Sequence, residues 1–158
     1  MEINVLFDAG FEKHLDAGWL DSIARATLVA QGIGEDAELG IVITGQEKVR
    51  ELNRDYRGRD EPTDVLSFNL QPEGDAEGDS IFAAPPDGVK HLGEVIISYP
   101  QVVRQAEERG HPVKKEIAIL IIHGVLHLLG YNHIKDNEAD IMSAKEAEVM
   151  KVIEAKLK

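Results

Sequence analysis

One short run constrains the fold of this chain more than any other segment: His-Gly-Val-Leu-His-Leu-Leu-Gly-Tyr-Asn-His, residues 123–133, which holds three of the six histidines. His123 and His127 are four residues apart, so on a helix they lie on one face, one turn apart. Gly130 can adopt a positive φ, which ends a helix and lets the chain turn back. That turn would bring His133 toward the first two histidines. The run therefore predicts a helix and a following turn that together hold three imidazoles.

The helix that carries these histidines is apolar on nearly every face. Its other side chains from residue 117 onward are small or aliphatic: Ile117, Ala118, Ile119, Leu120, Ile121, Ile122, Val125, Leu126, Leu128 and Leu129. Such a helix is buried in the core, and two buried imidazoles side by side are costly unless each has a partner. One solution is a shared metal ion, because three neutral nitrogens in a tripod suit Zn²⁺ and leave a fourth position open, as in catalytic zinc sites. The alternative is that other side chains satisfy the histidines.

The histidine spacing H-x-x-x-H-x-x-G-x-x-H is also that of the metzincin proteases, which read H-E-x-x-H-x-x-G-x-x-H. The glutamate that acts as general base in those enzymes corresponds here to Gly124, which has no side chain. The sequence thus predicts the metal tripod without the protease's base, and hence a chemistry that differs from the protease mechanism.

The length of 158 residues allows one sizeable core, so we expect residues 1–158 to form a single domain. Zero cysteines exclude disulfides and cysteine zinc sites, and they suit a reducing compartment. No apolar run approaches the ~20 residues that span a bilayer, and the acidic N-terminus does not resemble a secretory signal. We therefore expect a cytoplasmic protein that makes no contact with membranes.

The net charge of −12 argues against non-specific nucleic-acid binding, which depends on Lys and Arg at phosphates. The charge is unevenly distributed, however, because residues 48–59, the basic segment, carry five bases and two acids, a net +3. The bases are Lys48, Arg50, Arg54, Arg57 and Arg59. This segment is either an ordinary solvated helix face or a track for a phosphate backbone.

Periodicity and turn residues predict four strands and five helices. We expect strands at 2–8, 38–44, 64–69 and 93–98, helices at 12–31, 45–55, 100–109, 112–129 and 136–157, and loops at 56–62 and 71–91. Helical crossovers let the first, second and fourth strands be parallel, whereas no helix separates the third strand from the fourth, so these two should be antiparallel. The predicted fold class is α/β (α+β): a single domain with a mixed four-stranded sheet, one antiparallel edge strand and about five helices. This general arrangement is similar to that of the zincin proteases, an analogy of fold alone.

Three segments together resemble the YbeY family of bacterial endoribonucleases. Residues 52–68, Leu-Asn-Arg-Asp-Tyr-Arg-Gly-Arg-Asp-Glu-Pro-Thr-Asp-Val-Leu-Ser-Phe, resemble its signature L-N-x-x-Y-R-x-x-x-x-P-T-D-V-L-S-F. Residues 92–98, Leu-Gly-Glu-Val-Ile-Ile-Ser, resemble its strand L-G-D-I-x-I-S, and residues 123–133 resemble its motif H-G-x-L-H-L-x-G-Y-D-H. The segments occur in the family's order, and the correspondence covers nearly the whole chain.

The resemblance implies a metal-dependent endoribonuclease, specific for single strands, that acts in ribosomal RNA maturation and ribosome quality control. It implies one Zn²⁺ per chain, held by His123, His127 and His133, with Arg57 as the functional arginine beside the metal. We therefore expect Arg57, His123 and His127 to be catalytic. The expected partners are single-stranded RNA, above all ribosomal RNA, and the ribosome or its assembly factors, but not DNA.

Several alternatives stay open from the sequence alone. A zincin-like metallopeptidase and a non-enzymatic ribosome-assembly factor stabilised by a metal are rival functions. Arg57 could instead form a surface ion pair with Asp60 or Glu61. The sequence shows neither the general base nor whether water or the RNA 2′-hydroxyl attacks. The chain also departs from the family at Asn132 and Glu94, where Asp is usual, and Asn keeps the shape of Asp without its charge.

We expect the purified protein to contain about one zinc ion per chain, because three histidines stand at tripod spacing in a chain without cysteine. Elemental analysis of the protein and of the double variant His123→Ala/His127→Ala measures this directly. The double variant should lose the metal. An unchanged zinc content in that variant would show that these histidines are not the ligands.

Overall fold

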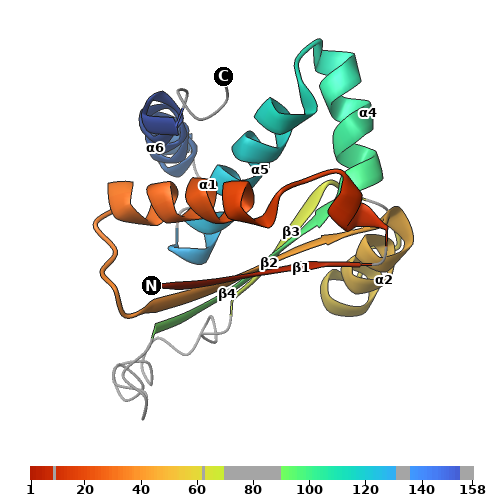
Figure 1. Ribbon diagram of the computed structural model, residues 1–158, viewed down its shortest axis with the longest axis horizontal. Helices are drawn as coiled ribbons and strands as arrows, with labels where there is room; N and C mark the ends of the chain where they lie inside the picture. Colours follow the sequence, from red (N-terminus) through yellow and green to blue (C-terminus); the bar gives the residue numbers. More distant parts are fainter. Residues whose placement is uncertain (9, 62, 70–89, 131–135, 154–158) are drawn as a thin grey trace.

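The sheet of this protein is mixed and has four strands in the order β1-β2-β4-β3. The computed structural model describes residues 1–8, 10–61, 63–69, 90–130 and 136–153 (Figure 1). Its strands are β1 (Glu2–Phe7), β2 (Ala37–Thr44), β3 (Val65–Asn69) and β4 (Lys90–Ser98). β1, β2 and β4 are parallel, and β3 is antiparallel to β4 at the edge of the sheet. The predicted antiparallel edge strand is confirmed.

The helices cover the two faces of the sheet unequally. One face carries α1 (Ala17–Ala30), α4 (Tyr99–Arg109), α5 (Val113–Leu128) and α6 (Asp136–Ile153), whereas α2 (Gln46–Arg57) lies on the other (Figure 1). Successive side chains of a strand point to opposite faces, so β4 contributes residues to the hydrophobic cores on both faces of the sheet. Val95 and Ile97 join the large core under α1 and α5, while Ile96 packs with Val49 of α2. No helix within the described residues is long and apolar enough to cross a membrane.

Helix α5 is the central helix of the larger layer. Ten of its residues are buried, as its apolar sequence predicts. Ile119, His123 and His127, spaced four residues apart, are only partly buried and form a stripe along one side. The helix ends at Leu128, and Gly130 has a φ of 106°, so the predicted end of the helix at this glycine is confirmed. The predicted return of the chain toward His133 lies outside the described residues. The packing of α5 thus decides which of its side chains reach solvent.

A buried polar cluster ties the corner between α4 and α5 to the start of β3. Glu116 is fully buried, and its carboxylate accepts hydrogen bonds from Arg109, at 2.8 Å, and from His111. Gln105 donates a 2.9 Å hydrogen bond to Asp64, the residue before β3. A buried carboxylate is tolerated when it is paired in this way. The cluster therefore anchors one end of β3 to the helices that stand beside it.

Two predicted helix boundaries were wrong. The helix expected at 12–31 is preceded by a short 3₁₀ turn, η1 (Phe11–Lys13), and α1 begins only after Asp16, whose carboxylate accepts a hydrogen bond from the Trp19 N–H at 3.1 Å. Such N-capping sets the start of a helix. The helix expected at 45–55 continues to Arg57, where Gly58 takes a left-handed conformation and ends it. Tyr56 and Arg57 therefore lie on the last turn of α2, and not in the expected loop.

The other boundaries agree with the predictions to within a few residues. Strand β4 was expected to begin at residue 93 but begins at Lys90, so the end of the loop expected at 71–91 belongs to the sheet. Residues 70–89 of that loop, and residues 154–157 of the last predicted helix, lie outside the described residues.

Helix α5 lies close against the sheet at Gly124. A Cβ atom added there would lie 2.8 Å from Cγ1 of Val95 and 3.2 Å from Oγ of Ser67. Val95 is fully buried, so an added side chain would have to displace a packed core residue. The structure therefore has no room for any side chain at the position where metzincin proteases carry their catalytic glutamate.

We expect Gly124→Ala to destabilise the protein by about 1–3 kcal/mol, because overpacking a dense core outweighs the roughly 1 kcal/mol by which alanine favours a helix. Urea unfolding measures the difference. Gly18→Ala in α1 is the matched control, since a Cβ there meets only Asp16 Oδ2, at an ordinary 3.4 Å, and should leave stability unchanged or raise it. A Gly124→Ala protein as stable as the parent would refute the close approach.

Candidate functional site

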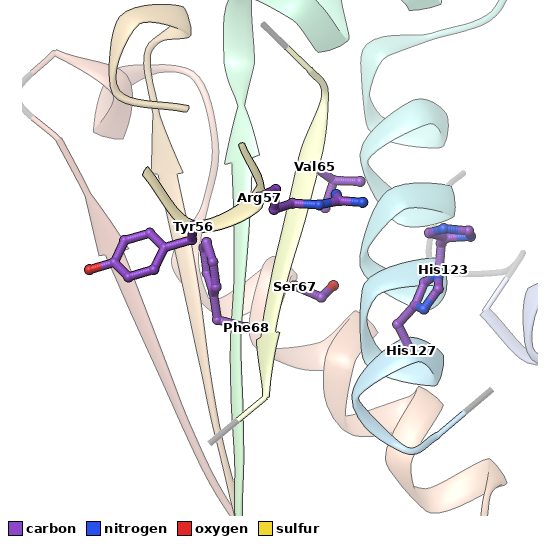
Figure 2. A pocket seen from close by; sticks show the side chains of 7 residues that line it. All are labelled: Tyr56, Arg57, Val65, Ser67, Phe68, His123 and His127. Atoms are coloured by element: carbon purple, nitrogen blue, oxygen red, sulfur yellow. The ribbon is translucent and has the colours of Figure 1, made fainter. Parts of the chain in front are cut away.

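A cavity of about 460 Å³ lies where α2, β3 and α5 meet, at the edge of the sheet. Within the described ranges, β3 pairs only with β4, and it contributes three of the residues that line this cavity. The lining residues come from all three elements: Tyr56, Arg57, Val65, Ser67, Phe68, His123 and His127 (Figure 2). The cavity therefore brings together the basic segment and the histidine helix, which are far apart in the sequence.

The two histidines of α5 form one wall of the cavity. Their ring centroids are 4.7 Å apart, and the ring planes are inclined by 70°. This pairing follows from the spacing of four residues on a helix, which the sequence predicted. His133, the third expected ligand, and Asn132 beside it lie outside the described residues. In the part of the chain that is described, no group of three or more His, Asp or Glu side chains could hold a metal.

A carboxylate from α6 faces one of these imidazoles. Oε2 of Glu146 lies 3.5 Å from Nδ1 of His123, and both side chains are about a quarter exposed. The contact turns Nδ1 toward α6, so that Nε2 is the nitrogen on the far side of the ring. The sequence does not indicate Glu146 as a site residue, because the amphipathic pattern of α6 does not show which of its acids meets the histidine helix.

Arg57 enters the cavity from the opposite side. Its side chain extends from the end of α2 across β3 toward α5 (Figure 2). The expected alternative, an ion pair with Asp60 or Glu61, is not observed, since Asp60 pairs with Arg50 at 2.8 Å. Within the described residues, Arg57 makes no hydrogen bond or ion pair. Its guanidinium is therefore available to an anion in the cavity.

Two other arginines of the basic segment, Arg50 and Arg54, form ion pairs on the surface. Arg50 binds Asp60, and this hydrogen bond raises the pKa of Arg50 above its ordinary value. Arg54 pairs with its neighbour Asp55 at 3.1 Å. Both ion pairs are exposed, and in each the aspartate offsets the positive charge of the arginine. The segment is thus partly a solvated helix face, and Arg57 is the member that lines the cavity.

Strand β3 supplies the floor of the site. Val65 and Ser67 point toward α5, and the Ser67 hydroxyl donates a hydrogen bond to the Gly124 carbonyl at 3.3 Å (Figure 2). Phe68 points to the other side of the strand, where its ring meets that of Tyr56 edge-on at a centroid distance of 5.4 Å. These residues were not among the predicted site residues, although the alternation of strand 65–69 places Val65 and Ser67 on one face.

The arrangement combines neutral nitrogen donors with a fixed positive charge. Imidazoles can hold a divalent cation, and a planar guanidinium binds a phosphate through two parallel hydrogen bonds. Arg57 places one fixed positive charge at this cavity of a protein whose net charge is −12, and that charge attracts anions to one place. Of the predicted site residues, the structure brings Arg57, His123 and His127 together around one cavity.

Comparison with known proteins gives one consistent result. The family described as Endoribonuclease YbeY matches residues 9–154. Proteins named Endoribonuclease YbeY are 51% identical over 156 residues in Dehalococcoides mccartyi strain BAV1, covering 97% of both chains, and 40% identical over 145 residues in Roseiflexus sp. strain RS-1, covering 90% of this chain and 87% of the relative.

A solved structure is similar over nearly the same length. The solution structure of TM1509 from Thermotoga maritima aligns with a TM-score of 0.62 and 26% identity, covering 97% of this chain and 90% of that protein. The arrangement of sheet and helices described above is therefore found in an experimentally determined structure.

Proposed function

This chain belongs to the family of YbeY endoribonucleases, and from that premise we propose that the cavity between α2, β3 and α5 is the active site for zinc-dependent cleavage of single-stranded RNA. We further propose that the natural substrate is ribosomal RNA, met on the ribosome or with its assembly factors in the cytoplasm. The observation that carries the proposal is that Arg57 lines the same cavity as His123 and His127.

The residues present fit a zinc ion. His123 and His127 offer two neutral nitrogens on one side of the cavity, and His133, five residues from the end of α5, would be the third ligand. Zinc, when bound, would supply Lewis-acid charge at a phosphate oxygen or lower the pKa of a water molecule. Glu146 would hold the His123 ring by its Nδ1 and leave Nε2 for the metal, as carboxylates do beside zinc-binding histidines.

Arg57 would bind and orient the phosphate that is cleaved. Its guanidinium crosses β3 from the face opposite α5, so a phosphate between Arg57 and the histidines would be held from two sides (Figure 2). A fixed positive charge also stabilises the extra negative charge that develops on the phosphate during cleavage. The edge of β3 is open at this point in the described residues, which suits an unpaired strand of RNA.

The two rival functions have less support. The metallopeptidase reading needs a base at residue 124, where a side chain cannot fit. The reading as a non-enzymatic assembly factor predicts that the metal changes stability alone. Cleavage rates with and without zinc, at a temperature where the metal-free protein stays folded, separate that reading from the one proposed here.

We expect Arg57→Ala to lower kcat/KM for cleavage of a single-stranded RNA by about 10²–10³-fold, since one donor to the reacting group is lost. Stability should change little, because Arg57 is exposed and has no ion pair among the described residues. Arg54→Ala is the matched control: it lies on the same helix and removes the same charge outside the cavity. Equal losses in the two variants, or a wild-type rate in Arg57→Ala, would remove Arg57 from the site.

We expect Glu146→Gln to weaken zinc binding about 10–100-fold, because the partner that orients His123 loses its charge. Competition with a chromogenic chelator measures the zinc affinity without any activity assay. Glu148→Gln is the control, since Glu148 lies on the same helix, is 59% exposed and faces Lys145 at 3.9 Å. An affinity that falls equally in both variants would show that only the total charge matters.

A further inference from the structure

A second, smaller cavity adjoins the proposed active site on the other side of β3. It has a volume of about 250 Å³ and is lined by Leu52, Tyr56, Phe68, Glu94 and Ile96. Tyr56 and Phe68 line both cavities. The two spaces therefore meet at this aromatic pair, next to Arg57.

Tyr56 is exposed to an unusual degree for an aromatic residue. It is 71% exposed, and it is the only aromatic among the large hydrophobic side chains that are exposed in the described part of the chain. Phe68 supports it edge-on, at a centroid distance of 5.4 Å. An aromatic ring held at the rim of an RNA-cleaving site is a surface on which a base can stack.

Chemistry distinguishes this second cavity from the first. Its walls are apolar apart from Glu94, whose side chain is exposed and lies over Gly40, where a Cβ would come within 3.1 Å of Glu94 Cγ. Within the described residues the Glu94 carboxylate makes no hydrogen bond or ion pair. A free carboxylate repels phosphate but accepts hydrogen bonds from the amino group of a base. The volume lies below the roughly 300–1,000 Å³ typical of drug-sized ligands and suits one flat ring system.

We propose that this second cavity is a nucleobase subsite, in which a base next to the cleaved phosphate stacks on Tyr56, lies beside Phe68 and presents an amino group to Glu94. The subsite rests on the proposed function, because its occupant belongs to the RNA that Arg57 and the histidines hold. It gives the enzyme a preference for an unpaired base with an amino group, such as cytosine, over uracil.

Variants at Tyr56 test the stacking. Tyr56→Leu keeps an apolar side chain but removes the ring, and it should raise KM for a single-stranded RNA roughly 5- to 150-fold with little change in kcat. Tyr56→Phe, which keeps the ring, is the matched control and should stay within about twofold of the wild type. Stacking is not ionic, so the dependence of log KM on log salt should keep its slope in Tyr56→Leu, whereas Arg57→Ala should reduce it by about one.

Substrates with one missing base test the site with the wild-type protein alone. An abasic nucleotide moved along the RNA should raise KM at one position beside the cleaved bond, and Tyr56→Leu should abolish that penalty. At the same position cytosine should be preferred over uracil about tenfold, and Glu94→Gln should reduce this preference toward one. An abasic penalty that persists in Tyr56→Leu, or a wild-type KM in that variant, would overturn the subsite.

The two proposals fail in different ways. If Arg57→Ala cleaves like the wild type while Tyr56→Leu and the abasic substrates behave as expected, the assignment of Arg57 fails and the base subsite stands. If Arg57→Ala loses activity while KM is insensitive to Tyr56 and to every abasic position, the active site stands and the second cavity is not a base subsite.

Discussion

The contact between Gly124 of α5 and the buried Val95 of β4 sets the geometry on which the rest of the site depends. The absence of a side chain at residue 124 lets the helix lie against the strands more closely than any other residue would allow. This approach brings the Gly124 carbonyl within hydrogen-bonding distance of Ser67. The neighbouring His123 is thereby held beside the edge strand. One glycine thus determines the distance between the histidine helix and the floor of the cavity.

That same approach separates this protein from proteases with the same histidine spacing. In the protease motif, the residue after the first histidine provides the general base. Here the space for that base is filled by Val95 and Ser67, so the difference is one of packing as well as of composition. Arg57, which comes from the opposite face of the sheet, gives the site a fixed positive charge instead. A positive charge serves a phosphate substrate better than it serves a peptide.

The distribution of charge explains how an acidic protein can act on an acidic polymer. Two arginines of the basic segment are paired with Asp60 and Asp55, which offsets part of the positive charge of α2 outside the cavity. Arg57 has no such partner among the described residues, and its charge is directed at the histidines. The Glu94 carboxylate lies on the other side of β3, where it would repel a phosphate. The positive charge of Arg57 and the negative charge of Glu94 therefore lie on opposite sides of β3.

The sequence by itself determined the elements, the strand directions and the histidine pair. These follow from short-range rules: periodicity, glycine turns, and the spacing of four residues that places His123 and His127 on one helix face. The family motifs also indicated Arg57. The sequence did not predict that α2 continues to Arg57, because the terminating glycine, Gly58, is followed by a charged segment that resembles a loop.

The tertiary structure alone decided what surrounds those residues. Packing at the sheet edge brings Arg57 of α2 to the cavity beside α5 and joins two cavities at Tyr56 and Phe68. Packing of α6 against α5 places Glu146 beside His123. No local pattern encodes these contacts, since each joins side chains of different elements, from 12 to about 70 residues apart, whose meeting depends on how those elements pack. They arise because the strand directions and the close approach of α5 to β4 at Gly124 fix where each element lies. The side chains of those elements then meet at the edge of the sheet.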